Sequence, residues 1–206
     1  MKRMLCVALA SLAVAGCAQM GGGSAAGGKS GGEGWITLFD GTSLENFDRV
    51  GDANWRIEDG NATADKGNGF LLTKKEFKDF QIRAEFYAES DTNSGVFLRC
   101  SNRKTISAAE CYEVNIWDTR PGQEYATGGI VDTAKVSPVP KAGGRWNTYE
   151  ITAKGDHLVV MLNGQKTAET HNGKHASGPI GLQRAPGNNK EAPTPIKWRR
   201  VEIKPL

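Results

Sequence analysis

Three side chains that could contact a sugar alternate along one stretch of extended sequence. In the segment 112–117, Glu113, Asn115 and Trp117 fall on one face of a strand, and the residues between them are apolar or aromatic. Neighbours on one strand face lie roughly 6.6 Å apart, so the three side chains form a continuous stripe. A carboxylate and an amide can bind hydroxyl groups, and an indole can cover a sugar ring. The stripe indicates a carbohydrate site, and the plainer alternative is the solvated face of an antiparallel sheet.

A conventional glycosidase would need a second carboxyl group near Glu113. Such enzymes place their two carboxyls roughly 5–5.5 Å apart for retention or 6.5–9.5 Å apart for inversion. Glu113 and Asp118 are five residues apart, which is roughly 17 Å along a straight strand, and they face opposite sides. They do not fit a catalytic pair unless the strand bends sharply after Trp117.

The elements that must position this stripe are strands. From Trp35 to Leu206, alternation of period two recurs and helical periodicity almost never does. Phe80–Ala88 alternates throughout, and Asn163-Gly164 joins 158–162 to 165–169 as a type I′ hairpin turn would. Further strands are expected at 35–39, 54–58, 69–72, 95–100, 112–117, 146–153, 180–183 and 196–204, with one helical turn at most near 74–78. Many short strands predict an all-β sandwich or jelly roll.

Two neighbouring strands extend the polar face in this interpretation. Phe97 and Arg99 alternate on the segment 95–100, and Gln183 lies on the segment 180–183. Because alternate residues of a strand share a face, we expect these side chains beside Glu113.

The N-terminus has the features of an exported lipoprotein. Lys2 and Arg3 precede an apolar run, 4–14, that is too short to cross a bilayer. Val14-Ala15-Gly16-Cys17 has the form of a lipobox, where a signal peptide is removed before an acylated cysteine. We therefore predict a signal peptide at 1–16, a lipidated Cys17 opening a Gly-rich tether at 17–34, and one domain at 35–206. The alternative is an ordinary signal peptide that happens to end beside a cysteine.

This organisation sets the location and the partners that we expect. Ala18 rather than Asp follows the cysteine, which favours the outer membrane over inner-membrane retention. The lipid anchor would be the sole membrane contact. The formal charge is +3, and removing Lys2 and Arg3 leaves +1, so no basic balance points to nucleic acid.

Two further patterns follow from this location. Gly23–Ser30 satisfies the phosphate-loop pattern, but no strand enters it and no helix leaves it, so we do not interpret it as a nucleotide site. Cys100 and Cys111 remain as an even pair in an oxidising compartment, flanking a short loop between two strands. They predict a disulfide, with two buried free thiols as the alternative.

Several motifs together resemble the 3-keto-disaccharide hydrolase family. They occur in the family's order at 35–41 with Leu44, 93–99, 112–118, 144–150, 162–164 and 178–183. The resemblance implies export, a concanavalin A-like jelly roll of two antiparallel sheets, and cleavage of glycosides oxidised at carbon 3 of the sugar. The chain departs from the family at Asn115, where Gln is usual, and at Arg145, where Glu is usual. The segment 184–195 is longer than the family's usual ending.

A 3-keto sugar changes what the site must do, because the ketone acidifies the hydrogen on carbon 2. One base could remove that proton, eliminate the aglycone and let water add afterwards. We assign Glu113 as the general base and Arg99 as the group that polarises the ketone or enolate oxygen. The remaining residues that we expect to contact the substrate are Asn93, Asn115, Trp117, Asp118 and Gln183.

No spacing in the sequence requires a cofactor. A divalent ion near Glu113 or Asp118 could stabilise an enolate. His171 and His175 are separated by Asn172-Gly173, which argues against one helical face, and we interpret them as loop residues. Two rival classes stay open, a non-catalytic carbohydrate-binding module and a structural envelope lipoprotein, since a fold does not fix a function.

Overall fold

The computed structural model describes residues 32–206. The predicted signal peptide, the lipidated Cys17, the phosphate-loop pattern at 23–30 and nearly all of the tether lie outside the described residues. Within 32–206, no helix has the length and apolar character needed to cross a membrane.

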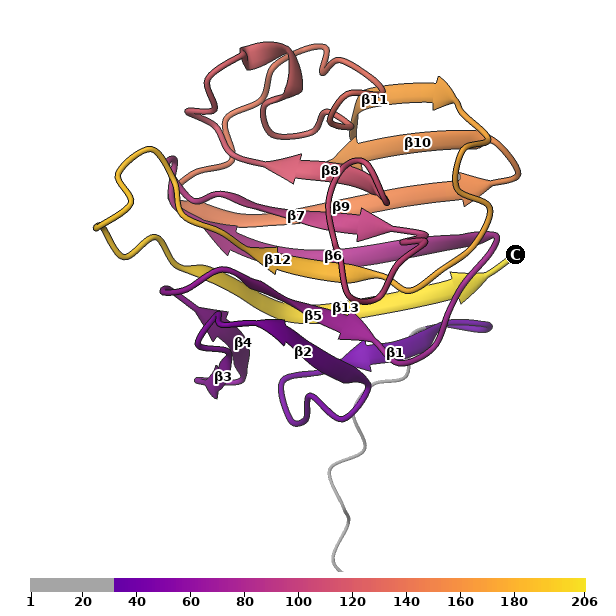
Figure 1. The fold of residues 1–206 in the computed structure, drawn as a ribbon. Coiled ribbons are helices and arrows are strands. Elements are labelled where there is room, and N and C mark those ends of the chain that lie inside the picture. The colour runs from indigo at the N-terminus through magenta and orange to yellow at the C-terminus, as the bar shows by residue number, and fades with distance from the viewer. Residues whose placement is uncertain (1–31) are drawn as a thin grey trace, which may run out of the picture.

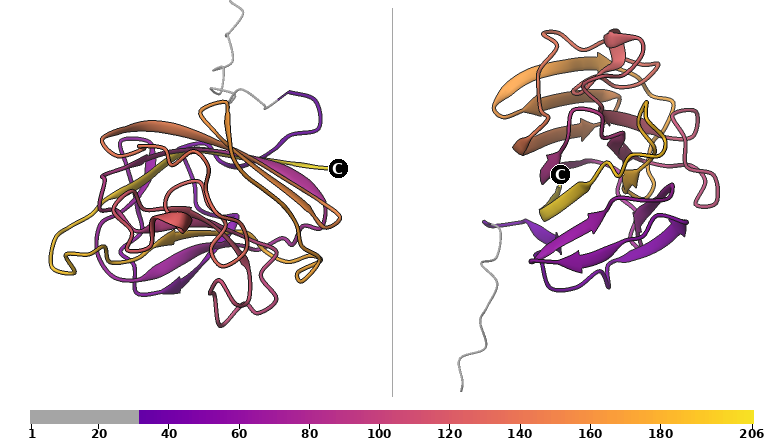
Figure 2. Two further views of the ribbon diagram at one scale, coloured as in Figure 1. Left: turned by 90° about the horizontal axis from the view of Figure 1, so that it is seen from above. Right: turned by 90° about the vertical axis from the view of Figure 1, so that its left-hand side faces the viewer.

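The described chain folds into two antiparallel sheets stacked as two layers (Figures 1 and 2). Sheet A has eight strands in the order β11-β10-β9-β6-β13-β4-β3, with β1 also paired to β13. Its strands are β1 (Ile36–Phe39), β3 (Arg56–Glu58), β4 (Asn61–Ala64), β6 (Phe80–Ala88), β9 (Arg145–Lys154), β10 (His157–Leu162), β11 (Gln165–His171) and β13 (Ile196–Pro205). Sheet B has five strands in the order β2-β5-β12-β7-β8. They are β2 (Phe47–Gly51), β5 (Gly69–Thr73), β12 (Gly181–Arg184), β7 (Ser94–Leu98) and β8 (Tyr112–Ile116). The predicted all-β sandwich of two antiparallel sheets is confirmed.

Alternation along the long central strands of sheet A places the core between the two sheets. In β6, every second residue from Phe80 to Ala88 is buried. Phe86 contacts Tyr149 of β9 and Trp198 of β13, with ring centroids 5.0 and 5.7 Å apart. Each buried aromatic side chain removes a large apolar surface from water, so this cluster contributes to the stability of sheet A.

The sequence predicted most strands within one or two residues of their ends. The β10–β11 hairpin turns at Asn163 and Gly164 with φ of 50° and 80°, as a type I′ turn requires. β2 and β4 were not predicted. The segment 74–78 forms no helix, and its Phe77 instead pairs with Gly178 as an isolated bridge. The short 3₁₀ helix η1 (Gln123–Tyr125) was also missed.

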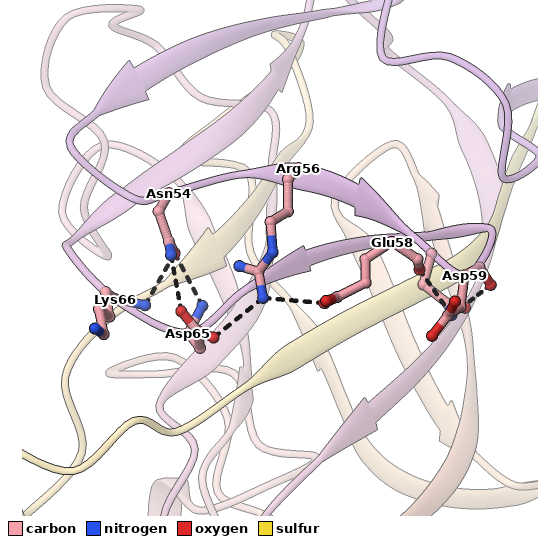
Figure 3. Close-up of polar contacts among 7 residues, drawn as sticks. Asn54, Arg56, Glu58, Asp59, Asp65 and Lys66 are labelled. Atoms are coloured by element: carbon pink, nitrogen blue, oxygen red, sulfur yellow. Dashed lines mark hydrogen bonds and ion pairs between the residues drawn. The ribbon is translucent and has the colours of Figure 1, made fainter.

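A polar network fixes the β3–β4 hairpin at the edge of sheet A (Figure 3). The Asn54 amide donates to Asp65 Oδ1 at 2.8 Å. The Arg56 guanidinium donates to Asp65 at 3.1 Å and to Glu58 at 3.0 Å. These exposed ion pairs contribute little each, so their role is to hold the hairpin in register.

The predicted disulfide is confirmed. Cys100 and Cys111 are joined, with a sequence separation of 11. The bond closes the loop that connects β7 to β8, next to the strand that carries Glu113.

Candidate functional site

Glu113 lies on the outer face of sheet B. Its neighbours Tyr112 and Val114 point into the core between the sheets and are buried. Glu113 is only partly buried and pairs across the ladder with Phe97 of β7. Phe97 packs edge-on against Phe70 of β5, with ring centroids 5.0 Å apart. The carboxylate therefore stands at the end of an aromatic row on the surface of the sheet.

Gly95 leaves room for the Glu113 side chain. A Cβ atom at position 95 would lie 3.5 Å from Glu113 Cγ, 3.5 Å from a Phe97 ring carbon and 2.9 Å from the Val114 carbonyl oxygen. The Glu113 side chain thus leans over the glycine. Any larger residue at position 95 would occupy the space beside it.

Gln183 lies on the same outer face as Glu113. It follows Leu182, which points into the core and pairs with Val96 of β7. Gln183 Oε1 is buried and has no hydrogen-bond partner in the described structure. An unpaired buried acceptor is costly, and nothing in the described chain offsets that cost at Gln183.

The surroundings of Glu113 change its acidity. Burial raises the pKa of Glu113 to about 7, Arg120 opposes this shift with its positive charge, and Asp132 adds to it with its negative charge. The Glu113 carboxylate makes no hydrogen bond with any residue of the described chain. A carboxylate with a pKa near neutral pH, held without a partner, is suited to take a proton.

Asn115 is close to Glu113 in sequence but is closed off from solvent. It is 1 % exposed, and its amide nitrogen donates to the Tyr125 carbonyl at 2.6 Å. Its backbone also bonds to Gly128 and Gly129. Asn115 therefore fastens the connection that carries η1, seen above β8 in Figure 1, to the edge of the sheet.

Trp117 is half-buried and its indole is already engaged. Its Nε1 donates to Asp91 Oδ1 at 3.1 Å. Asp91 also accepts hydrogen bonds from Thr119 at 2.6 Å and from the backbone N–H groups of Asn188 and Asn189 at 3.1 Å each. These bonds hold the pKa of Asp91 far below its usual range, against the opposing effect of burial. Asp91 thus sets the position of Trp117 and of the 187–189 loop.

Asp118 has a structural role in this arrangement. It is 5 % exposed. One carboxylate oxygen accepts the Thr127 hydroxyl at 2.6 Å, and the other accepts the backbone N–H groups of Ala142 and Gly143 at 2.8 and 2.9 Å. Asp118 ties together two segments of the connection after β8, and it does not form a glycosidase pair with Glu113.

Arg99 is not brought to Glu113, contrary to the prediction. Its φ of 51° ends the strand and turns the side chain away from the outer face. The guanidinium is fully buried. It donates to the Lys78, Gly155 and His175 carbonyls at 2.6, 2.7 and 3.3 Å and to Asp79 Oδ1 at 3.0 Å. We therefore assign Arg99 no part in the chemistry.

Asn93 lies at the opposite end of β7 from Arg99. Its amide donates to the Pro186 carbonyl at 2.9 Å, and its backbone pairs with Ala185. This contact holds the start of the 184–195 segment.

Arg120 and Asp132, the charges that act on Glu113, were not singled out from the sequence, because both lie on the long connection after β8 whose path no periodicity predicts.

The described residues contain no group of three or more His, Cys, Asp or Glu side chains arranged to hold a metal ion. Asp118, one of the two positions considered for a divalent ion, has both oxygens occupied by protein donors.

Comparison with known proteins agrees with this architecture. A curated protein of Bacteroides thetaiotaomicron named 3-keto-disaccharide hydrolase is 26 % identical over 173 residues, which cover 68 % of this chain and 59 % of the relative. The chain thus matches less than two thirds of that protein's length.

Solved structures show the same fold. The crystal structure of a candidate glycosyl hydrolase from Parabacteroides distasonis is 26 % identical, with a TM-score of 0.67, and the match covers 84 % of this chain and 99 % of that one. A carbohydrate-binding module from Bacillus subtilis, CBM66, is 13 % identical with a TM-score of 0.55, covering 83 % of this chain and 95 % of that one, and shows a shared fold alone. A protein from the same species with a galectin-like fold has a TM-score of 0.59 at 12 % identity, covering 78 % of this chain and 90 % of that one.

One family model spans almost the entire described chain. The model of the 3-keto-alpha-glucoside-1,2-lyase-like domain matches residues 34–204. The match includes both sheets, the strand that carries Glu113 and the 184–195 segment. Together with the jelly-roll fold and the order of the sequence motifs, this match shows that the chain belongs to the 3-keto-disaccharide hydrolase-like family. The family model describes its members as 3-keto-alpha-glucoside-1,2-lyase-like domains.

Proposed function

We propose that this protein cleaves glycosides whose sugar is oxidised to a ketone at carbon 3, with Glu113 as the general base. The observation that carries the proposal is the Glu113 carboxylate itself. It is partly buried on the outer face of sheet B, unpaired within the described chain, and has a pKa near 7. Family membership supplies the substrate class, since the curated relative is named for a 3-keto-disaccharide.

The reaction needs one base because the ketone activates carbon 2. Glu113 removes the proton from carbon 2, and the electron pair forms the enolate of the ketone. The bond from carbon 1 to the aglycone oxygen then breaks and leaves a carbon 1–carbon 2 double bond, while the aglycone oxygen takes up a proton from solvent. Water adds its hydroxyl group to carbon 1 and releases a proton to solvent, and carbon 2 regains its proton from Glu113. One water is consumed overall.

The enolate oxygen needs a positive charge or a hydrogen-bond donor close to it. We assign this role to Arg120 in place of Arg99, because Arg120 is close enough to lower the pKa of Glu113 and is only half-buried. Gln183, on the same face, would bind a sugar hydroxyl. Trp117 would lie against the sugar ring while Asp91 holds its indole.

Substitution of Glu113 tests its role as the base. Glu113→Gln keeps the size of the side chain but cannot accept the proton, so turnover of 3-keto-trehalose should fall by about 10²–10⁴-fold. Glu150→Gln is the matched control, because Glu150 is exposed on the outer face of sheet A and pairs with Arg83. Chromatography of the released product measures the turnover of both variants. Retention of activity within tenfold by the Glu113 variant would remove Glu113 from the mechanism.

The substrate class is tested on the unmodified protein. Turnover of 3-keto-trehalose and 3-keto-lactose, with none of trehalose and lactose, supports the elimination mechanism, since only the oxidised sugars have an acidic carbon 2 hydrogen. Tight binding of the same sugars without turnover would instead indicate a carbohydrate-binding module. Neither binding nor turnover would favour a structural envelope protein.

We also propose that the protein acts in the cell envelope, anchored by a lipid on Cys17. The lipobox and the apolar run before it support this proposal. In the expressing bacterium, Cys17→Ala should abolish labelling by radioactive palmitate and leave the signal peptide on the protein, because its removal requires the acylated cysteine. An immunoblot that resolves the two lengths measures the second effect, and palmitate labelling that persists in the variant would contradict the anchor.

A further inference from the structure

A hollow of about 290 Å³ lies beside the Glu113 strand, where the edge of sheet B meets the loop after β11. Its lining includes Tyr112, Asp132, Thr133, Asn172 and His175. The volume matches the low end of the range for small-molecule sites, which start at about 300 Å³. Polar and apolar groups both line it, as a sugar unit would require.

His175 is the buried polar group in this wall. It is 6 % exposed, and its ring lies edge-on to Tyr112 with centroids 5.0 Å apart. Its backbone N–H donates to the Tyr112 hydroxyl at 2.9 Å. Because the backbone fixes the residue from both sides, through Tyr112 and through Arg99, the position of the imidazole is set before any ligand arrives.

The imidazole has one nitrogen without a partner. Nε2 is buried and makes no hydrogen bond in the described structure, while the backbone of Ala109 favours the protonated ring. Burial lowers the pKa of His175, and Lys174 adds to the shift. A neutral ring that donates from Nδ1 presents Nε2 as an acceptor, so it suits a hydroxyl donor and not an anion.

The hollow adjoins the strand that carries the proposed base. Val131 donates a backbone hydrogen bond to the Glu113 carbonyl at 2.9 Å, and the next residue, Asp132, lines the hollow. The negative charge of Asp132 also adds to the raised pKa of Glu113. The segment 131–132 therefore lies against the Glu113 strand and forms part of the wall of the hollow.

We propose that the hollow binds the leaving sugar of a 3-keto-disaccharide, with His175 and Asp132 accepting hydrogen bonds from its hydroxyl groups. The proposal rests on the proposed function, because it places the oxidised sugar at Glu113 and the second sugar here. Thr133 and Asn172 add a hydroxyl and an amide to the same wall. The disulfide holds the opposite rim, since Cys111 and the loop residues Ala108 and Ala109 line it.

The test compares a disaccharide with a substrate that lacks the second sugar. In His175→Phe, which keeps the ring packing on Tyr112, KM for 3-keto-trehalose should rise about tenfold, as expected for one lost hydrogen bond in a buried site. KM for methyl 3-keto-glucoside should stay within twofold. His171→Phe is the matched control, because His171 is exposed and bonds to Asp156 outside the hollow.

Thr133→Val gives an independent measurement if the His175 variant does not fold. Thr133 is half-exposed and lines the hollow, and its loss should raise KM for the disaccharide several-fold with the methyl glycoside unchanged. Equal changes for both substrates, or no change for either, would overturn the proposal.

A binding measurement separates this proposal from the proposed function. If the unmodified protein turns over none of these substrates, its imidazole signals are followed by NMR during a titration with trehalose. A shift of the His175 signals without a shift of the His171 signals keeps the hollow as a sugar site although the hydrolase function has failed. The absence of that shift overturns the hollow as well.

Discussion

At the scale of single residues, the environment of Glu113 links catalysis to pH. Its pKa of about 7 arises from burial, with Asp132 adding to the shift and Arg120 opposing it. A base acts only when ionised, so kcat/KM should rise with pH through an apparent pKa near 7. A pH–rate profile on 3-keto-trehalose measures this rise, and a profile already flat from pH 5 upward would contradict it.

Asp132→Asn should move that acidic limb to lower pH. Removing the negative neighbour makes ionisation of Glu113 easier, so its pKa falls and activity persists further into acid. Asn tolerates the positive φ of 55° at this position. Asp59→Asn, at a similar φ of 51° in the β3–β4 turn, is the matched control and should leave the profile unchanged. A shift to higher pH in the Asp132 variant would show that Asp132 does not raise the pKa of Glu113.

Alternation predicted the strand face on which Glu113 lies, but not which of its neighbours on that face would be covered by other segments. Glu113 and Asn115 share a strand face, yet only Asn115 is covered, because the connection after β8 returns and its Tyr125 carbonyl takes the amide hydrogen bond. The path of that connection depends on contacts distant in sequence. The same limit applies to Arg99, whose positive φ turns the side chain out of the alternation that predicted it.

At the scale of elements, strands with strong alternation were predictable and weakly apolar ones were not. β6 alternates over its entire length and was predicted with its observed bounds. β4 consists of Asn61–Ala64, with only small or polar side chains, so periodicity gave no signal. The Asp59-Gly60 turn, with φ of 51° and 71°, is the feature of the sequence that could have indicated the β3–β4 hairpin.

The disulfide stabilises the β7–β8 connection. A loop of this size predicts a loss of about 2–3 kcal/mol in the free energy of unfolding when the bond is removed. Urea denaturation of the Cys100→Ser/Cys111→Ser double variant should show a lower midpoint than the oxidised protein. The unmodified protein under reducing conditions should match the variant, and equal midpoints with and without the bond would show that it adds no stability.

At the scale of the whole molecule, Arg99 joins segments that are distant in sequence. It connects the start of β6, the β9–β10 turn and the loop after β11 through Lys78, Gly155 and His175. Arg99→Met should lower the free energy of unfolding by about 3–5 kcal/mol, because it leaves these carbonyls and Asp79 without their buried partner.

Urea denaturation measures the Arg99 variant against a matched control. Arg103→Met removes an arginine that is partly exposed and paired with Asp48, so it should cost less than about 1 kcal/mol. A similar small loss for both variants would mean that Arg99 does not hold the two sheets together.

The pairing of β1 with β13 has a consequence for how the molecule would be oriented in the envelope. The described chain begins beside sheet A, where β1 pairs with β13. There the exposed Arg83 guanidinium lies over the Trp35 ring, with its Cζ atom 4.9 Å from the ring centroid. Glu113 stands on the outer face of the other sheet. A tether through Cys17 would therefore join the domain on the side away from the carboxylate and leave the face that carries Glu113 open to dissolved sugars.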